Sequence, residues 1–291
     1  MRKATRALIL IALMLMLWQS VALAAVQALP LDESGGLPPD PAGFLDELNY
    51  QDPSINVTIS QDRAHNTDYW VGRVKIEHPS QLRTTSAGGW DSGRTTSGMA
   101  MYKRVSAVMA INGDYFSYIN DGYLIRHGQL YRDLPRGQRD VLLIDEAGDF
   151  HIALKADKDS ILPYKDMAIV NSFNFGPALV VDGQRVQRYV DHDNAANKGR
   201  QRMAIAQVAP GSLEYVVVAC SGPSGRSQGM TLDQFSRVVF DQGVHSAYNL
   251  DGGNSTMLMF NEAFVNAHLE PTMRPISDII YFASAWQPAG E

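Results

Sequence analysis

The segment Tyr248–Thr256, which reads Tyr-Asn-Leu-Asp-Gly-Gly-Asn-Ser-Thr, constrains this chain more than any other stretch. It lies between a helix-like segment (231–242) and a short apolar run (257–260). Its two adjacent glycines permit a tight turn and let another group approach the backbone closely. Asp-Gly between apolar residues is also the strongest short signal for a β-hairpin. The segment alone is therefore compatible with a plain hairpin or with a strand end that carries a site.

A second stretch has the same design. In the run 107–116, an apolar strand-like sequence ends in Asn112-Gly113-Asp114 and is followed by two aromatic residues. Two predicted strands thus each end in an Asn, a Gly and an Asp. Carboxylates at strand ends on a rigid scaffold are well placed for chemistry. The repetition favours a site, with Asp114 and Asp251 as its two acidic side chains.

Together, the two stretches resemble the two signatures of the phosphodiester glycosidase family. The resemblance extends approximately from Val71 to Phe282. The other motifs that carry it are, in order, Phe175–Gly183, Arg202–Gln207, Gly225-Arg226 and Met273–Ser277. Asn254 stands where the family usually has a third Gly or another small residue. Met203 and Ala206 stand where Thr and Gly are common. We expect these differences to affect substrate preference rather than to remove the site.

The resemblance implies hydrolysis of a sugar-1-phosphodiester. Glycoside cleavage passes through an oxocarbenium-like state and usually needs two carboxylates, so Asp114 and Asp251 are predicted to be catalytic, without assignment of their roles. Arg202 and Arg226 are predicted to bind phosphate, because guanidinium groups bind its oxygens in a planar, bidentate way. A surface position is the alternative for both arginines. The other predicted substrate-binding residues are Asn112, Gly113, Tyr115, Asn249, Gly252, Gly253, Ser255 and Thr256.

The amino terminus has the pattern of a secretory signal peptide. A basic start (1–6) precedes an apolar run (7–17) and the small-x-small site Ala22-Leu23-Ala24. The apolar run is shorter than the roughly 20 residues of a membrane span. We therefore expect cleavage after Ala24, an exported protein and no membrane span in the mature chain. A linker or lead-in rich in Pro, Gly and acidic residues (25–53) would precede the catalytic domain (54–291).

Composition and periodicity predict the class of fold. The 291 residues are 45% hydrophobic and 19% charged, which is ordinary for a globular protein. Short alternating runs separated by turns predict an α+β fold, with a mixed, largely antiparallel sheet and a few packed helices in one catalytic domain. The clearest helix begins with the capping box Thr231–Gln234 and should end at Gly243. The net charge of −6 argues against nucleic acid as a partner.

Several other side chains yield expectations. Trp90 is predicted to be a core residue rather than a platform for sugar stacking. Arg126 and His127, in the predicted hairpin 124–130, are candidates for a site beside the first signature if the hairpin lies over it, but a solvent-facing pair is the favoured interpretation. Cys220 ends an apolar run and should be a buried, inert strand residue. The triplet 191–193, Asp-His-Asp, has no known metal-binding spacing and is predicted to be a polar loop. No metal or cofactor is therefore predicted.

The sequence leaves three functional classes to compare. The favoured one is an exported glycosidase that hydrolyses a sugar-1-phosphodiester in a glycan or a cell-envelope polymer such as an exopolysaccharide. A non-catalytic protein that binds sugar-phosphate polymers at the cell surface is the alternative. A structural surface domain, in which both Asp-Gly turns are plain hairpins, is the third. The presence of both aspartates favours the enzyme. The sequence makes no prediction about the oligomeric state.

Overall fold

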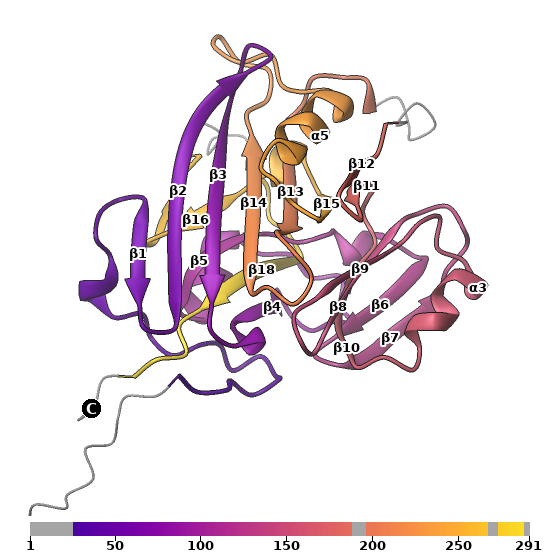
Figure 1. Cartoon of the computed structure of the whole chain (residues 1–291), viewed down its shortest axis with the longest axis horizontal. Helices are drawn as coiled ribbons and strands as arrows, with labels where there is room; N and C mark the ends of the chain where they lie inside the picture. Colours follow the sequence, from indigo (N-terminus) through magenta and orange to yellow (C-terminus); the bar gives the residue numbers. More distant parts are fainter. Residues whose placement is uncertain (1–25, 188–195, 267–272, 288–291) are drawn as a thin grey trace, which may run out of the picture.

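The computed structural model describes residues 26–187, 196–266 and 273–287. Most described residues belong to antiparallel sheets, and few helices cover them (Figure 1). Strands account for 42% and helices for 15% of the structure, so the predicted α+β class holds only in its coarse form, with sheet dominant. The prediction of largely antiparallel pairing is confirmed, because every pairing between the described strands is antiparallel.

The strands form four sheets. The largest has the order β1 (Asn49–Asp52), β2 (Ile55–Ala64), β3 (Thr67–Ile76), β14 (Glu214–Cys220), β13 (Arg202–Gln207), β15 (Ser246–Leu250), β11 (Ala178–Val181), β12 (Gln184–Arg185). The second has the order β17 (Ala263–Phe264), β16 (Leu258–Phe260), β5 (Ala107–Asn112), β18 (Asp278–Ala283), β4 (Leu82–Ser86). Beside them lie the small sheet β10 (Ile169–Phe173), β8 (Val141–Asp145), β9 (Phe150–Ala153) and the hairpin β6 (Gly122–Arg126), β7 (Gln129–Leu134).

The helices are short. The described α-helices are α2 (Gly98–Arg104), α3 (Lys158–Ile161) and α5 (Leu232–Phe240). Single 3₁₀ turns occur at η1 (Pro41–Gly43), η2 (Pro79–Gln81), η3 (Phe116–Tyr118), η4 (Leu162–Tyr164) and η5 (Gly253–Ser255). Among the described residues, we find no helix with the length and apolar character needed to cross a membrane.

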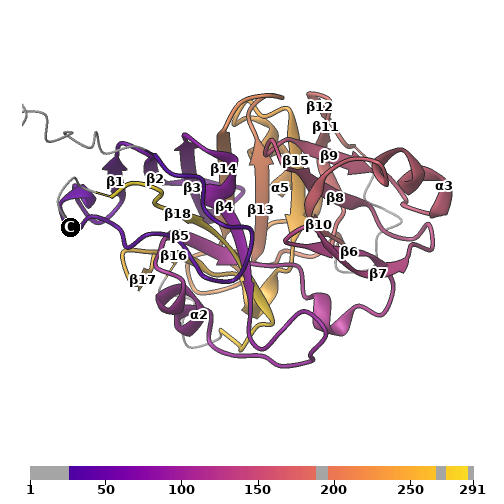
Figure 2. The same cartoon turned by 90° about the horizontal axis from the view of Figure 1, so that it is seen from below.

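The two large sheets pack face to face between helices (Figures 1 and 2). Successive strand residues point to opposite faces, so each buried strand contributes to two apolar layers. On β13, Met203 lies in the core between the sheets, and Ala204 lies in the core under α5. On β18, Ile280 lies between the sheets, and Ile279 lies in the core that includes residues of α2. The layers are therefore helix, sheet, sheet and helix.

Helix α5 confirms the predicted capping box. The Thr231 side chain accepts a hydrogen bond from the Gln234 amide, and the Gln234 side chain accepts one from the Thr231 amide. The apolar stripe that includes Phe235 and Val239 is buried against the eight-stranded sheet. The chain leaves the helix near Gly243, whose φ of +75° is accessible to glycine at little cost. Local sequence thus specifies this helix at both ends.

The Asp-Gly-Gly turn is not a hairpin, so that interpretation was wrong. Strand β15 belongs to the eight-stranded sheet, whereas β16 pairs with β5 in the five-stranded sheet. The turn carries the chain from one sheet to the other. The two signature strands, β5 and β15, likewise belong to different sheets. Their ends nevertheless meet, because the Asn112 side chain donates a hydrogen bond to the Asp251 carbonyl (2.7 Å).

Other sequence expectations have mixed outcomes. Trp90 and Cys220 are buried, as predicted, and burial raises the pKa of the Cys220 thiol to about 12. Arg126, predicted to face solvent, is instead fully buried, because β6 packs beside β10, where the Ile125 amide donates to the Ser172 hydroxyl. Tyr50 of β1 is also fully buried, so the described part of the predicted lead-in packs against the domain.

Two predictions lie outside the described residues. These are the signal peptide (1–24) and the polar loop around Asp191, His192 and Asp193.

Candidate active site

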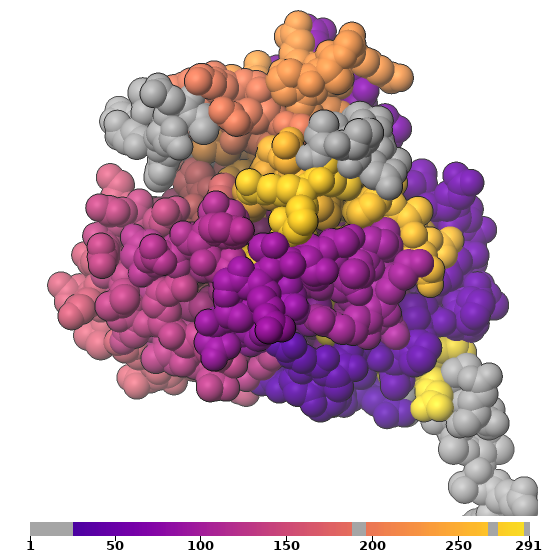
Figure 3. All heavy atoms as spheres, turned by 180° about the vertical axis from the view of Figure 1, so that it is seen from behind, coloured from indigo at the N-terminus to yellow at the C-terminus, as the bar shows by residue number. Residues whose placement is uncertain are grey.

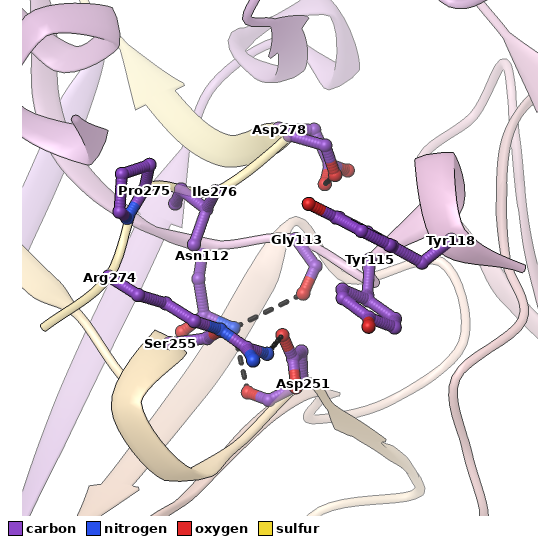
Figure 4. Close-up of a pocket in the computed structure, with 11 residues that line it drawn as sticks. Asn112, Gly113, Tyr115, Tyr118, Asp251, Ser255, Arg274, Pro275, Ile276 and Asp278 are labelled. Carbon is purple, nitrogen blue, oxygen red and sulfur yellow. Dashed lines mark hydrogen bonds and ion pairs between the residues drawn. The ribbon is translucent and has the colours of Figure 1, made fainter. Parts of the chain in front are cut away.

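Two adjoining cavities lie where the ends of β5, β15 and β18 converge. The smaller has a volume of about 130 Å³ and contains both Asp251 and Asp278 in its lining (Figure 4). The larger has a volume of about 760 Å³. Tyr115, Asp251 and Arg274 are among the residues that line both. On the face shown in Figure 3, the purple-to-magenta part of the chain meets the yellow carboxyl-terminal part, although the two are far apart in the sequence.

Asp251 and Asp278 are the two carboxylates of the smaller cavity, and both are buried. Burial raises the pKa of Asp251, while the Ser255 hydroxyl and the Arg274 guanidinium oppose that shift. Burial, together with the negative charge of Asp114, raises the pKa of Asp278 to about 7. Two carboxyl groups with different environments in one cavity are the usual basis for separate acid and base roles. The pair is therefore suited to proton transfer at neutral pH.

Arg274 holds Asp251 in place at the junction of the cavities. Its Nη2 donates to Asp251 Oδ2 (2.9 Å), and its Nε donates to the Ser255 hydroxyl (2.7 Å). The guanidinium carbon lies 5.3 Å from the ring centroid of Tyr115. Nearly half of the Arg274 side chain is exposed, so its remaining N–H groups can reach a ligand. Arg274 therefore orients a carboxylate and presents positive charge to the cavity.

Asp114 lies beneath this site rather than in it. It is fully buried and belongs to the lining of neither cavity. Its Oδ1 accepts from Arg126 Nη2 (3.0 Å), and its Oδ2 accepts from the Asn174 amide (2.7 Å). The same Arg126 Nη2 donates to Asp278 Oδ2 (3.4 Å). The structure therefore does not place Asp114 and Asp251 against a common ligand; Asp114 is connected to the cavity through Arg126 and Asp278.

The residues around Asp114 constrain the backbone of the first signature. A β-carbon on Gly113 would collide with the carboxylate of Asp278, so only glycine fits there. Tyr115 has φ of +68°, which is costly for a bulky side chain. This conformation places its ring in a stack with Tyr118, with centroids 4.3 Å apart. Such strain is typically retained at functional sites. The signature thus shapes the cavity wall.

The two predicted phosphate-binding arginines have different locations. Arg202 lines the larger cavity but is mostly buried, and it donates to the carbonyls of Met230 (2.8 Å) and Lys198 (3.1 Å). Arg226 lines neither cavity; its side chain is 75% exposed and pairs with Asp68 (2.9 Å). The structure thus brings Arg202 to the site and leaves Arg226 on the surface.

The remaining predicted residues lie at or close to the cavities. Asn112, Gly113 and Ser255 line the smaller one, whereas Asn249, Gly252 and Gly253 line the larger one. Asn249 donates to the Gly176 carbonyl (2.7 Å), which fixes the loop before Pro177. A β-carbon on Gly252 would lie 2.7 Å from the Gln201 carbonyl oxygen. Thr256 is buried and lines neither cavity.

Sequence reasoning missed Asp278 and Arg274 as functional candidates. Both lie in a segment whose first part, Met273–Ser277, had been connected only with the family pattern. No local turn or strand-end signal distinguishes Asp278, since it begins an apolar strand far from both signatures. Within the described parts of the chain, no cluster of three or more His, Cys, Asp or Glu residues is arranged to hold a metal ion.

Comparisons with known proteins identify relatives of this chain. The chain is 27% identical over 188 residues to an uncharacterized protein, YomE, derived from the SPbeta prophage of Bacillus subtilis strain 168. That match covers 62% of this chain but only 29% of the relative. The chain therefore spans less than a third of that relative's length.

Solved structures show the same fold. One is the catalytic domain of zebrafish N-acetylglucosamine-1-phosphodiester alpha-N-acetylglucosaminidase, auto-inhibited by its pro-peptide; it has a TM-score of 0.62 and 20% identity, and the match covers 80% of this chain and 85% of that one. A hypothetical protein from Synechocystis has a TM-score of 0.54 and 16% identity, over 78% of this chain and 62% of that one.

The family model of the phosphodiester glycosidases matches residues 106–283. This range holds both signatures, the aspartates Asp114, Asp251 and Asp278, and Arg274, and it covers more than half of the sequence. The chain therefore belongs to the phosphodiester glycosidase family.

Proposed function

We propose that this protein hydrolyses a sugar-1-phosphodiester by cleaving the bond between the anomeric carbon and the phosphate oxygen. The observation that carries the proposal is the pair of buried carboxyl groups, Asp251 and Asp278, in one small cavity beside an available guanidinium, Arg274. Family membership supports the reaction class. Residues with perturbed pKa values in a cavity are typical of catalytic sites.

The environments of the two carboxyl groups suit different roles. Asp278 is held protonated near neutral pH by burial and by the charge of Asp114, so it is the proton donor. Burial raises the pKa of Asp251, but Arg274 and Ser255 bind its ionised form, so we assign it the negative charge that stabilises the cationic transition state. Other enzymes with two carboxyl groups also use the one with the raised pKa as the acid and keep the other ionised.

The reaction then balances without any further group. As the bond between the anomeric carbon and the bridging oxygen breaks, its electron pair goes to the phosphate. Asp278 gives its proton to that oxygen, and water supplies the hydroxyl of the free sugar. Asp278 recovers a proton from the water in the second half of the reaction. A phosphate departs more easily than an alcohol when positive charge lies beside it.

Arg274 is the group that we assign to the phosphate. It lies where the two cavities join, next to Asp251, and its side chain is partly exposed. Guanidinium groups form charge-assisted, bidentate hydrogen bonds with phosphate oxygens. Arg202 would contribute charge from the floor of the larger cavity while holding the backbone of residues 198 and 230.

The first prediction concerns the carboxyl pair. Asp278→Asn and Asp251→Asn should each lower kcat by about 10²–10⁴-fold, the usual contribution of positioned acid–base groups, because neither amide can donate a carboxyl proton or carry negative charge. The measurement uses p-nitrophenyl diesters of several hexose 1-phosphates. A glycosidase releases free sugar and p-nitrophenyl phosphate. Release of sugar 1-phosphate and p-nitrophenol would instead indicate phosphoryl transfer and would contradict the proposal.

The same assay separates the enzyme from a binding protein. A binder would retain affinity for the diester by calorimetry but release no product from any member of the panel. The Thr256→Val variant, which changes a buried residue of the same signature outside both cavities, serves as a control for indirect effects of mutation.

The second prediction concerns pH. Asp278 is protonated below its pKa of about 7, so kcat/KM should fall as the pH rises through about 7. In Asp114→Asn the repulsive charge is gone and Arg126 can pair with Asp278 alone. Both changes lower the pKa of Asp278, so the alkaline limb of the profile should move to lower pH. Activity would be recovered at acidic pH.

Asp68→Asn is the matched control for this shift. Asp68 is also a buried aspartate paired with arginines, Arg63 and Arg226, but it lines neither cavity. Replacing Asp68 should leave the alkaline limb of the kcat/KM profile at the same pH. A uniform loss of activity at every pH in Asp114→Asn would mean that Asp114 only supports the fold.

The third prediction concerns the phosphate. Arg274→Lys keeps the positive charge but loses the planar fork, so kcat/KM for the diesters should fall by about tenfold or more. Arg226→Lys, on the surface, should leave kcat/KM unchanged. Equal effects of the two substitutions, or none at Arg274, would remove Arg274 from phosphate binding.

We also propose that the protein acts outside the cytoplasm, on a glycan or cell-envelope polymer. The basic start, apolar run and Ala-Leu-Ala site of residues 1–24 support this. Amino-terminal sequencing of the protein from its native host should begin near Ala25. Recovery of a cytosolic product that retains Met1 would refute export.

A further inference from the structure

We propose that the larger cavity binds an extended, negatively charged oligosaccharide as the leaving group of the substrate. The inference rests on the proposed function, because it assigns the part of the substrate beyond the scissile phosphate. Three observations carry it: the size of the cavity, the arginines in its lining, and an exposed aromatic stack at its edge.

Size is the first observation. Ligand cavities usually measure about 300–1,000 Å³. The smaller cavity, at about 130 Å³, is below that range and holds both carboxyl groups, so the anomeric carbon belongs there. The larger cavity, at about 760 Å³, far exceeds the needs of one phosphate. Asp251 and Arg274 line both, so a substrate cleaved at the junction places its leaving group in the larger cavity.

Charge is the second observation. Arg139 and Arg200 line the larger cavity in addition to Arg202 and Arg274. Arg200 has an exposed side chain that forms no ion pair with a described residue, and Arg139 pairs with Asp121 at 3.3 Å while 41% exposed. The whole chain carries a net charge of −6, so this concentration of cations is local. A cavity lined by one sign of charge attracts ligands of the other sign.

Two acidic side chains, Asp140 and Asp251, line this cavity against four arginines, so an excess of positive charge remains. Asp140 accepts hydrogen bonds from the Lys155 and Ala178 amides (2.8 and 2.9 Å), and Asp251 is bound by Arg274. One scissile phosphate, already assigned to Arg274, leaves Arg139 and Arg200 with no function in the cleavage step. Further negative groups on the ligand would give both of them a partner.

Aromatic surface is the third observation, and it favours a sugar chain over a bare polyanion. Tyr118 stacks on Tyr115 with an interplanar angle of 12°, and 55% of Tyr118 is exposed at the junction of the cavities. Phe175 and Leu232 add apolar surface to the larger cavity. Aromatic rings bind the apolar faces of sugar rings, whereas a polyphosphate has no such face. Arginines and an aromatic platform together fit an anionic glycan.

The test is a direct binding measurement with three probes. These are a heparin-derived hexasaccharide, the neutral sugar maltohexaose, and an inorganic polyphosphate of six units, each titrated by calorimetry against the full chain. The hexasaccharide should bind at least tenfold more tightly than either of the others, and its affinity should decrease with added salt. Equal binding of the hexasaccharide and maltohexaose would show that the cavity does not select a negatively charged ligand. Equal binding of the hexasaccharide and polyphosphate would show that the cavity does not recognise sugar rings.

Variants locate the binding. Arg139→Gln combined with Arg200→Gln should weaken both charged probes by about tenfold or more. Tyr118→Ala should weaken the hexasaccharide but not the polyphosphate. Arg237→Gln and Tyr131→Ala, at exposed residues that line neither cavity, are the matched controls and should change nothing. Unchanged affinity in the cavity variants would place the binding elsewhere and refute the proposal.

The outcome is independent of the proposed reaction. Hydrolysis of small diesters without preference for the hexasaccharide would refute this inference and leave the reaction standing. Tight, cavity-dependent binding of the hexasaccharide without hydrolysis of any diester would refute the reaction and leave only a binding site for an anionic glycan.

Discussion

The buried contact of Arg126 with two aspartates is the interaction on which the site depends. Its Nη2 lies between Asp114 (3.0 Å) and Asp278 (3.4 Å), and all three side chains are almost completely excluded from solvent. The guanidinium carbon lies 4.4 Å from the Phe173 ring centroid and 5.0 Å from that of Trp90. Two carboxylates with one guanidinium leave one excess negative charge, which is costly in an apolar interior. That cost appears as the raised pKa of Asp278, which lines the smaller cavity.

This constraint explains why three distant segments must meet. Asp114 follows β5, Arg126 ends β6 and Asp278 begins β18, so the network joins the five-stranded sheet to the β6–β7 hairpin. Gly113 lets the backbone of the first signature approach Asp278 closely. The Asn112 side chain then binds the Asp251 carbonyl across the gap between the sheets. The second carboxylate is thereby held relative to the first through backbone contacts rather than through a flexible loop.

The proposed reaction would account for the asymmetry of the site. Asp278 lines the smaller cavity, Asp251 lines both, and the additional arginines line the larger one. A sugar that becomes cationic and a phosphate that becomes more negative require opposite charges on the two sides of the breaking bond. Arg274 lies at the boundary and donates to Asp251, the carboxylate that we propose stabilises the sugar. In the proposed reaction, a carboxylate would lie beside the cationic sugar and arginines beside the phosphate.

Local sequence determined what depends on neighbours in the chain. It predicted the cap and stripe of α5, the buried strand that ends at Cys220, and the strands that end at Asn112 and Leu250. It did not predict that the Asp-Gly-Gly turn crosses between sheets or that Arg126 is buried. It named Asp114 rather than Asp278 as a catalytic carboxyl group, because which of the two faces a cavity depends on packing across the sheets. Turn chemistry and helix caps are set by residues a few positions apart, whereas burial, charge pairing and the resulting pKa values are set by segments that only the tertiary structure brings together.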